Sequence, residues 1–304
     1  MVEIIRDIGT VSVKNIRVGL VATPLLLLAA ACSAEPTPPL GFLEPDPTSG
    51  IPCADFIPPE ISDATLAGDL VKGWGFILKQ PIGFAEHGCL VVSANDGYPT
   101  RSGDHAIRFE VRDGDCNRWM DGWNDCTTDR SRHELTQIGI SSPSQQDGDE
   151  YWYAWSEYLP TATLKEGKAI TFLGQFNSDN AARFYIEDFH DGVGFRFNDR
   201  NYDLIKRKTL AQNQIVRNGW TDFMIHAVWS TSDDGLIEIY VNGGLAETVS
   251  GPNMDGASKV HFDFGIYNAF LSRCSCDSMP TQIVYFDDIR RGLTRHEVEV
   301  APRL

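Results

Sequence analysis

The stretch HFDFGIYNAF, residues 261–270, alternates between apolar and polar side chains, as the two faces of a β-strand require. One face carries the apolar side chains Phe262, Phe264 and Ile266. The other face carries Asp263, Gly265 and Tyr267, which are too polar or too small to fill a core. A glycine in a strand allows a close approach to the backbone. The pattern is compatible with the floor of a groove, but this stretch alone favours a half-exposed strand that carries an ordinary surface tyrosine, and only other segments of the chain change that preference.

The rest of the chain contains similar short runs, separated by Gly, Asp, Asn and Pro. Strands are predicted at residues 105–112, 131–138, 151–159, 170–176, 183–189, 194–198, 221–229, 236–241, 260–267 and 283–289. Residues 190–192 and 242–244 have the composition of hairpin turns. We expect Leu164–Lys168 and Asp203–Gln212 to be loops or short helices. This succession predicts one all-β domain made of two packed antiparallel sheets.

The N-terminal segment has the composition of an export signal. Its basic residues are Arg6, Lys14 and Arg17. The apolar run that follows, residues 18–31, is too short to span a bilayer comfortably and ends in LAAAC. Residues 1–32 are therefore predicted to be a signal peptide of lipoprotein type with Cys32 as the lipidated residue, and secretion after cleavage near Ala34 is the alternative. We expect a bacterial cell envelope lipoprotein, at the outer membrane or cell surface, or a secreted protein.

Composition divides the remaining chain into a linker and a domain. Residues 33–59 are rich in proline and small residues and are predicted to form an extended linker, whereas residues 60–304 are predicted to fold. The net charge of −16 argues against non-specific binding to nucleic acid or to an anionic membrane, so membrane contact is expected only through the lipid anchor. An anionic ligand is compatible with this charge, because clustered arginines can invert the field inside one cleft. We expect a monomer.

Six cysteines follow Cys32, namely Cys53, Cys89, Cys116, Cys126, Cys274 and Cys276. An even number in an exported chain favours disulfides over metal thiolates. The first two are predicted to staple the N-terminal arm to the domain, and the next two to close a loop. A bridge between the last two would be strained, since one residue separates them, so cross-pairing is the alternative. No cofactor is predicted to be required; the Asp- and Asn-rich turns are compatible with a structural calcium ion, but no ligand spacing supports one.

Three further segments present polar side chains in alternation, namely RSRHEL (130–135), LGQFNS (173–178) and TDFMIHAVW (221–229). The first places Arg130, Arg132 and Glu134 on one face and His133 on the other. Gln175 and Asn177 share a face of the second, and His226 faces away from the core in the third. Taken singly, each segment has an ordinary explanation: a surface ion pair, a sheet edge or a histidine whose hydrogen bonds are satisfied.

Several familiar catalytic patterns are missing from the sequence. It contains no evident Ser-His-Asp signature, phosphate-binding glycine loop or HExxH motif. The carboxylate pairs at residues 187–188 and 287–288 are adjacent, so a strand would split each pair between its two faces. That geometry is poor for a glycosidase, which needs two carboxylates facing each other across a groove.

Taken together, several segments resemble the heparin-lyase-I-like polysaccharide lyases. They are RSRHEL (130–135), YWYAWSEYLP (151–160), LGQFNS (173–178), GWTDFMIHAVWS (219–230), DGLIEIYVNG (234–243), FDFGIYNAF (262–270) and VYFDDIRRG (284–292). The resemblance implies a β-jelly roll, a concanavalin-like sandwich of two antiparallel sheets, which the family shares with glucuronan and alginate lyases. It also implies β-elimination on a uronic-acid polysaccharide that leaves a 4,5-unsaturated sugar.

The resemblance also implies roles for individual residues. Tyr267 matches the catalytic tyrosine of the family and is expected to donate a proton. Arg132, Gln175 and Asn177 carry the fixed hydrogen-bond donors needed to neutralise the carboxylate of the reacting uronate. Substrate-binding positions are predicted at Arg130, Glu134, Asp263 and Asn268.

Two positions depart from the family pattern. Related lyases commonly read Gln-x-His where this chain has Asn177, and they carry a lysine where it has Asp263. The base therefore has alternatives: either Tyr267 acts as both base and acid in a syn elimination, or His133 or His226 supplies the base. The remaining alternative is a non-catalytic carbohydrate-binding lipoprotein on the same fold.

A run of basic residues after residue 195 bears on the substrate. Its members are Arg196, Arg200, Lys206, Arg207 and Lys208. They are predicted either to restore positive potential along the groove or to form a solvated loop. Because the acidic chain lacks abundant lysine, we expect glucuronan or alginate more than heparin as the substrate.

Overall fold

The computed structural model describes residues 49–53, 70–72, 76–79, 82–119, 122–137, 144–160, 169–178, 182–189, 192–198, 204–209, 217–254 and 256–300. The predicted signal peptide, Cys32 and residues 164–168 lie outside these ranges. Within them, no helix has both the length and the apolar composition needed to cross a membrane.

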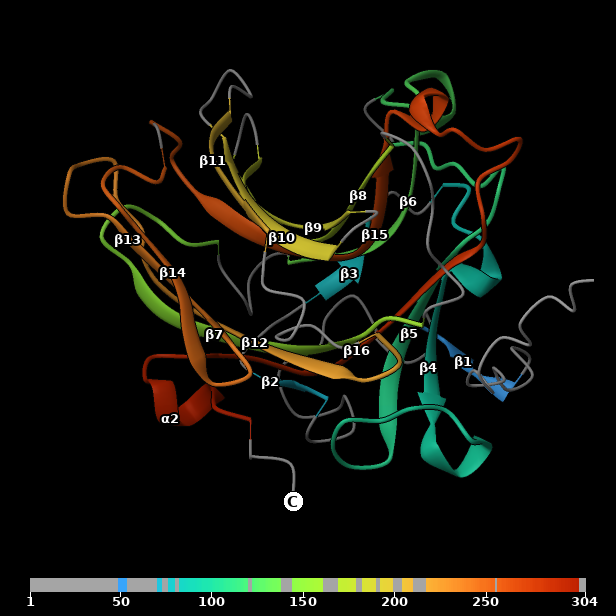
Figure 1. The fold of residues 1–304 in the computed structure, drawn as a ribbon, viewed down its shortest axis with the longest axis horizontal. Helices are drawn as coiled ribbons and strands as arrows, with labels where there is room; N and C mark the ends of the chain where they lie inside the picture. The colour runs from blue at the N-terminus through green and yellow to red at the C-terminus, as the bar shows by residue number, and fades with distance from the viewer. Residues whose placement is uncertain are drawn as a thin grey trace, which may run out of the picture. The chain divides into compact units, whose positions relative to one another are not determined.

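Two β-sheets form the described part of the protein (Figure 1). The first contains β1 (Ile51–Pro52), β2 (Val71–Lys72), β4 (Cys89–Ser93), β5 (His105–Val111), β7 (Glu150–Tyr158), β12 (Trp220–Val228), β13 (Leu236–Val241), β14 (Gly244–Ser250) and β16 (Gln282–Gly292). These strands are ordered β1-β4-β5-β16-β7-β12-β13-β14, and β2 pairs in parallel with β16. We call this the nine-stranded sheet.

The second sheet contains β3 (Phe76–Leu78), β6 (Arg130–Gln137), β8 (Ile170–Ser178), β9 (Ala182–Phe189), β10 (Gly192–Asn198), β11 (Leu204–Thr209) and β15 (Val260–Ala269). Its order is β11-β10-β9-β8-β15-β6-β3, and we call it the seven-stranded sheet. Short helical turns make up the remaining elements: η2 (Glu86–Gly88), η3 (Ala94–Asp96), η4 (Asp125–Thr127), η6 (Leu271–Arg273) and α2 (Arg295–Val298).

The core lies between the two sheets, where their apolar faces meet. Phe262, Phe264 and Ile266 of β15 are buried, as the alternating pattern predicts. Phe262 packs on Trp155 of β7 with the ring centroids 5.0 Å apart, and Phe264 packs on Phe286 of β16 at 5.1 Å. The other face of the seven-stranded sheet is concave and turned away from the nine-stranded sheet (Figure 1). The polar rows of β6, β8 and β15 lie on this concave face.

The observed strands confirm the predicted all-β sandwich, and every strand predicted from the sequence is present. The prediction of a loop or short helix at residues 203–212 is wrong, because residues 204–209 form β11 at the edge of the seven-stranded sheet. The sequence of β11, LIKRKT, lacks a clear apolar row because an edge strand has little core to face. β4 and β14 were also not predicted; β14 is a largely exposed edge strand after the expected turn at Asn242 and Gly243, both of which have positive φ.

Three disulfides join cysteines of the described ranges. They join Cys53 to Cys89, Cys116 to Cys126 and Cys274 to Cys276. The first two pairings are the predicted ones, whereas the third is the local bridge rather than the cross-paired alternative. Residues 51–52 pair with β4, so this part of the segment predicted to be linker is attached to the sandwich.

Gly265 fits a position in β15 that no other residue would occupy without strain. Its φ is +138°, and the register between β15 and β8 shifts between Phe264 and Tyr267. A Cβ atom at this position would overlap the carbonyl oxygen of His133 in β6. The close approach that the glycine permits is therefore made by the neighbouring strand, not by a ligand.

Replacing Gly265 with alanine is expected to lower the free energy of unfolding by about 3 kcal/mol or more, because it adds both a steric overlap and an unfavourable φ. Denaturant unfolding measures the change. Gly244→Ala is the matched control, since the nearest atom to an added Cβ there is the Val241 carbonyl oxygen at 3.7 Å. Equal stability of the two variants would show that β15 adjusts without cost.

Candidate active site

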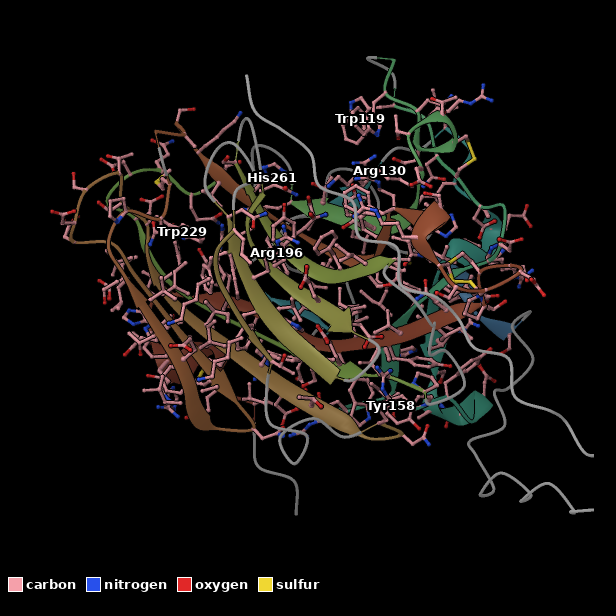
Figure 2. All side chains as sticks on the ribbon, turned by 45° about the horizontal axis from the view of Figure 1, so that its top comes forward. Trp119, Arg130, Tyr158, Arg196, Trp229 and His261 are labelled. Atoms are coloured by element: carbon pink, nitrogen blue, oxygen red, sulfur yellow. A yellow bond between two sulfur atoms is a disulfide. The ribbon has the colours of Figure 1, made fainter. Side chains whose placement is uncertain are left out.

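A cavity of about 640 Å³ lies on the concave face of the seven-stranded sheet. Figure 2 looks towards this face, with Arg130 and Arg196 on the sheet and Trp119 on a loop beside it. The cavity is lined by Lys79, Trp119, Trp123, Arg130, Arg132, Ile170, Phe172, Gln175, Asn177, Tyr185, Arg196, Asn198, Tyr267, Ala269 and Phe270. One cavity thus brings together the four residues to which the sequence analysis gave roles in proton transfer and charge neutralisation, Arg132, Gln175, Asn177 and Tyr267.

Tyr267 is held by two arginines from β6, the strand next to β15. The Nε–H of Arg130 donates to the Tyr267 hydroxyl oxygen over 2.8 Å. The guanidinium carbon of Arg132 lies 3.8 Å from the centroid of the Tyr267 ring, which is a close cation–π contact. Phe172 of β8 packs on the same ring with centroids 5.4 Å apart. The phenol is therefore fixed in direction and surrounded by positive charge.

Arg132 is fixed by a buried carboxylate. Its Nε–H and Nη2–H donate to the two carboxylate oxygens of Asp125, each over 2.8 Å, and Asp125 is fully buried. Burial alone would lower the pKa of Arg132, but the neighbouring Tyr267, Glu134 and Asp125 raise the pKa above its ordinary value. Arg132 therefore stays a cation with a fixed orientation at the wall of the cavity.

The amide groups of Gln175 and Asn177 are oriented by carboxylates below the cavity. Gln175 Nε2 donates to Glu134 over 2.5 Å, and Asn177 Nδ2 donates to Asp263. Each amide nitrogen carries a second hydrogen, so both side chains keep a donor after making these bonds. Glu134 and Asp263 are almost completely buried and do not line the cavity. The structure therefore corrects their predicted role from substrate binding to the positioning of the two amides.

Lys79 supplies the cation that the sequence pattern lacked at position 263. It follows β3, and its Nζ binds the Asp263 carboxylate and lies 3.6 Å from Glu134 Oε2. The pKa of Asp263 is lowered, because Lys79 and His261 outweigh the effect of burial, whereas burial raises the pKa of Glu134. The short run FILK, which ends in Lys79, shows no alternation of polar and apolar residues that would assign the lysine to a face of a sheet. Only the pairing of β3 with β6 reveals its position.

Three predicted site residues lie elsewhere, and their candidacy is withdrawn. Asn268 is buried between the sheets, where it accepts from Thr171 over 2.6 Å. His133 is fully buried on the opposite face of β6; its Nδ1 lies 2.6 Å from the Glu110 carbonyl oxygen, and burial lowers its pKa. His226 belongs to the nine-stranded sheet.

His226 is satisfied where it lies. Its ring nitrogens are 2.9 Å from Glu238 and 2.8 Å from Glu150, and the ring stacks on Trp152 with centroids 4.3 Å apart. Neither His133 nor His226 can therefore act as the base for a reaction on the concave face.

His261 is a residue of the concave face that the sequence analysis did not select. It lies opposite Asn177 in the pairing of β15 with β8, and its Nε2 is 3.7 Å from Asp263 Oδ2. The side chain is 26% exposed. It lies next to the position where the family pattern expects a histidine, but on the neighbouring strand. The alternation of residues 261–267 contained this signal, because His261 shares a face with Asp263 and Tyr267.

The basic run contributes one described residue to the cavity, Arg196. Its Nε–H donates to Asn198 over 2.8 Å, and its Nη1 lies 3.4 Å from Glu187. Lys206 and Lys208 bind Glu247 of β14 at 2.8 and 3.1 Å, so they tie the two sheets together at their edges. Arg200 and the side chain of Arg207 lie outside the described residues.

Among the described residues, one group of side chains has the spacing to hold a metal ion, namely His87, Asp115 and His133, whose ligand atoms lie within 4.8 Å of one another. His87 Nε2 and Asp115 already lie 2.8 Å apart, and the group is on the opposite side of β6 from the cavity. The arrangement on the concave face involves none of these three residues.

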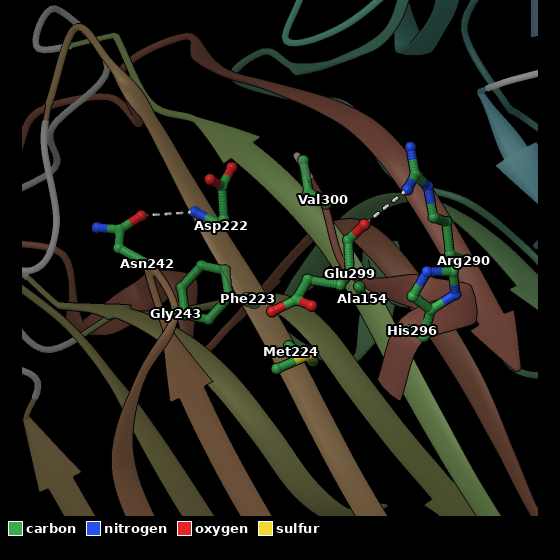
Figure 3. Close-up of a pocket in the computed structure, with 10 residues that line it drawn as sticks. All are labelled: Ala154, Asp222, Phe223, Met224, Asn242, Gly243, Arg290, His296, Glu299 and Val300. Carbon is green, nitrogen blue, oxygen red and sulfur yellow. Dashed lines mark hydrogen bonds between the residues drawn. The ribbon is translucent and has the colours of Figure 1, made fainter. Parts of the chain in front are cut away.

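A second cavity of about 640 Å³ lies on the nine-stranded sheet near α2 (Figure 3). Asp222, which lines it, receives two hydrogen bonds from Arg101, and Arg290 donates to the Glu299 carbonyl oxygen. Asp222 and Arg290 of this cavity are thus already engaged by other groups of the chain, and Glu299 and Val300 adjoin residues outside the described ranges. The concave face is therefore the better candidate for the active site.

Comparisons with known proteins agree with this fold. A family model described as polysaccharide lyase matches residues 92–290. The endo-β-1,4-glucuronan lyase of the fungus Trichoderma reesei has the same fold, with a TM-score of 0.55 and 14% identity over 76% of this chain and 96% of that chain. The alginate lyase of Corynebacterium sp. has a TM-score of 0.47 and 16% identity over 71% of this chain and 93% of that chain. No curated protein matches the sequence.

Replacing Lys79 with methionine is expected to destabilise the protein by about 3–5 kcal/mol at pH 7, because it removes the closest cation from two buried carboxylates and leaves Glu134 only Arg132, 3.7 Å away. The loss should shrink as the pH falls towards 4, since protonation removes the unpaired charges. Unfolding by urea at both pH values measures the effect. Lys208→Met, which removes an exposed lysine that also binds a carboxylate, is the control and should cost less than about 1 kcal/mol. A pH-independent loss at position 79 would contradict this account.

Proposed function

The chain belongs to the polysaccharide lyase family, and we propose that it cleaves a uronic-acid-containing polysaccharide by β-elimination on the concave face of its seven-stranded sheet. Family membership makes the protein a polysaccharide lyase. Within the family, we propose a heparin-lyase-I-like relationship, on the motifs at residues 130–135 and 262–270.

One observation carries the proposal: the cavity combines the fixed phenol of Tyr267 with the guanidinium groups of Arg130 and Arg132 and the oriented amides of Gln175 and Asn177. No carboxylate among the described residues lines it. Glycoside hydrolysis by two opposed carboxylates is therefore not supported at this site. A set of donors and cations around one proton-transfer group instead suits the removal of a weakly acidic proton beside a substrate carboxylate.

The proposed reaction moves one proton and one electron pair. A base removes the proton from C5 of the uronate, and the electron pair left on C5 spreads into the adjacent carboxylate. Arg132 and the free amide hydrogens of Gln175 and Asn177 stabilise this added charge, because they are already oriented before the substrate arrives. The electron pair then forms the C4–C5 double bond, the bond from C4 to the glycosidic oxygen breaks, and an acid protonates the departing oxygen.

We assign both the base and the acid to Tyr267, which gives a syn elimination. The phenolate takes the C5 proton and the resulting phenol returns a proton to the glycosidic oxygen on the same side of the ring. Arg130 donates to the phenol oxygen and Arg132 lies against its ring, so both cations stabilise the negative charge of the phenolate. His261 is the competing base, and its role would instead be consistent with an anti elimination.

The charges near the cavity favour a polyuronate without dense sulfation, such as glucuronan or alginate. Arg130, Arg132 and Arg196 line the cavity, whereas Lys79 is paired with buried carboxylates. Lys206 and Lys208 are directed to Glu247 and add no cation to the cavity. We also propose that the protein is exported and anchored through Cys32, as the N-terminal sequence predicts, and that it acts as a monomer.

Incubating the protein with polyglucuronate, alginate and heparin should produce the ultraviolet absorbance of a 4,5-unsaturated uronate with at least one of the first two. Heparin should give the weakest signal. If the protein binds these polymers and produces no unsaturated product from any of them, the carbohydrate-binding alternative replaces the lyase.

Replacing Tyr267 with phenylalanine should lower kcat by about 10³-fold or more while changing substrate affinity by less than about threefold, because only the hydroxyl that transfers the proton is lost. His261→Gln should retain at least about a tenth of the wild-type kcat. Turnover is followed by absorbance, and affinity by calorimetry with the slow variant. A loss in His261→Gln as large as that in Tyr267→Phe would make His261 the base.

A further inference from the structure

The disulfide-closed loop between Cys116 and Cys126 carries two tryptophans that line one end of the cavity. Trp119 is half-buried and Trp123 is 43% exposed, which is unusual for such a large apolar side chain. Figure 2 shows Trp119 on this loop, above the part of the sheet that carries Arg130. An exposed indole inside a polar cavity needs an explanation beyond core packing.

The loop fixes the backbone beside Trp119 and holds the Trp123 ring in place without covering it. The backbone N–H of Trp119 donates to the Trp123 carbonyl oxygen over 2.7 Å, and Arg118 donates to the Ile82 carbonyl oxygen over 2.9 Å. The indole N–H of Trp123 donates to Asp125 Oδ1 over 2.9 Å. Because the indole edge is bonded and the backbone is crosslinked, little conformational freedom would be lost when a ligand binds to the ring.

The loop is also connected to the proton-transfer group. Asp125 accepts from Trp123 and holds the guanidinium of Arg132 with two further hydrogen bonds, and Arg132 lies over Tyr267. The side chains of Trp123, Asp125, Arg132 and Tyr267 thus form a chain of direct contacts. A ligand seated on the tryptophans would lie close to the reacting residues.

Cations accompany the aromatic rings at this end of the cavity. The guanidinium carbon of Arg130 lies 5.7 Å from the Trp123 ring centroid and 5.5 Å from that of Phe270. Arg273 lies 3.9 Å from the Phe270 ring centroid. Aromatic rings stack favourably on the apolar C–H face of a sugar ring, and guanidinium groups pair with carboxylates. A uronate residue combines both features.

We propose that the Cys116–Cys126 loop forms an additional binding subsite, in which Trp119 and Trp123 stack on a uronate residue of the polysaccharide beyond the residue that reacts. Arg130 and Arg273 bind the carboxylate of that sugar or of its neighbour. This inference rests on the proposed function, because it takes the substrate to be a polyuronate. It makes the loop a determinant of the preferred chain length of the substrate.

The test compares a hexamer with a trimer of β-1,4-linked glucuronate or mannuronate, using Trp119→Ala, Trp123→Ala and the double variant. Affinity is measured by calorimetry in the Tyr267→Phe background, and turnover is measured separately by absorbance in the background with Tyr267 intact. Each single variant should lower the ratio of hexamer to trimer affinity by about 5- to 20-fold, and the double variant should lower it further. Trp152→Ala, which removes a partly exposed tryptophan of the nine-stranded sheet, is the matched control and should leave this ratio unchanged.

The outcomes separate this subsite from the proposed reaction. If the wild-type chain binds oligouronates and the loop variants keep the wild-type ratio, the subsite is wrong whether or not the protein is a lyase. If the ratio falls but no unsaturated product forms with the Tyr267-intact protein, the subsite stands and the proposed reaction fails. Failure of the wild-type chain to bind either oligomer overturns both. Circular dichroism of each variant identifies any loss caused by misfolding, and Trp123→Phe, which keeps an aromatic face, should restore at least half of the lost ratio on a logarithmic scale.

Discussion

Lys79 binds two buried carboxylates, Asp263 of β15 and Glu134 of β6, and the polar face of the sheet depends on this contact. Without a cation, two carboxylates in a buried position would be costly to maintain. With it, they can act as fixed acceptors that orient the amides of Gln175 and Asn177. A buried ion pair that contributes little net stability can still determine where neighbouring donors point, and here those donors face the cavity.

The second support of the site comes from outside the sheet. Asp125 lies in the disulfide-closed loop, holds Arg132 with two hydrogen bonds and accepts a third from Trp123. The loop therefore contributes to the site in two ways. Its carboxylate orients a cation beside Tyr267 by hydrogen bonding, and its tryptophans offer an aromatic surface for stacking at the end of the cavity. Fixing both with one crosslinked segment keeps their relative geometry constant, which is the condition for electrostatic stabilisation without reorganisation.

The departures from the family pattern have a structural explanation. Asp263 replaces the expected lysine, but Lys79, which follows β3, binds its carboxylate, so the local charge is largely compensated. Asn177 replaces the expected histidine, and His261 lies opposite it on the neighbouring strand. In both cases a residue of the expected type lies beside the position but is contributed by a different segment. A comparison of aligned positions cannot detect such an exchange. It compares residues at equivalent positions of the same strand, whereas here the residue comes from another segment.

The sequence by itself determined the all-β sandwich, most strand positions and the four residues Arg132, Gln175, Asn177 and Tyr267 that meet in one cavity. It could do so because a strand's period of two assigns each side chain to a face, and that assignment is local. Only the tertiary structure excluded His133, His226 and Asn268, and only it placed Lys79, His261 and the loop tryptophans at the site. These outcomes depend on which strands are neighbours and which face is covered, and contacts between residues far apart in the chain decide both.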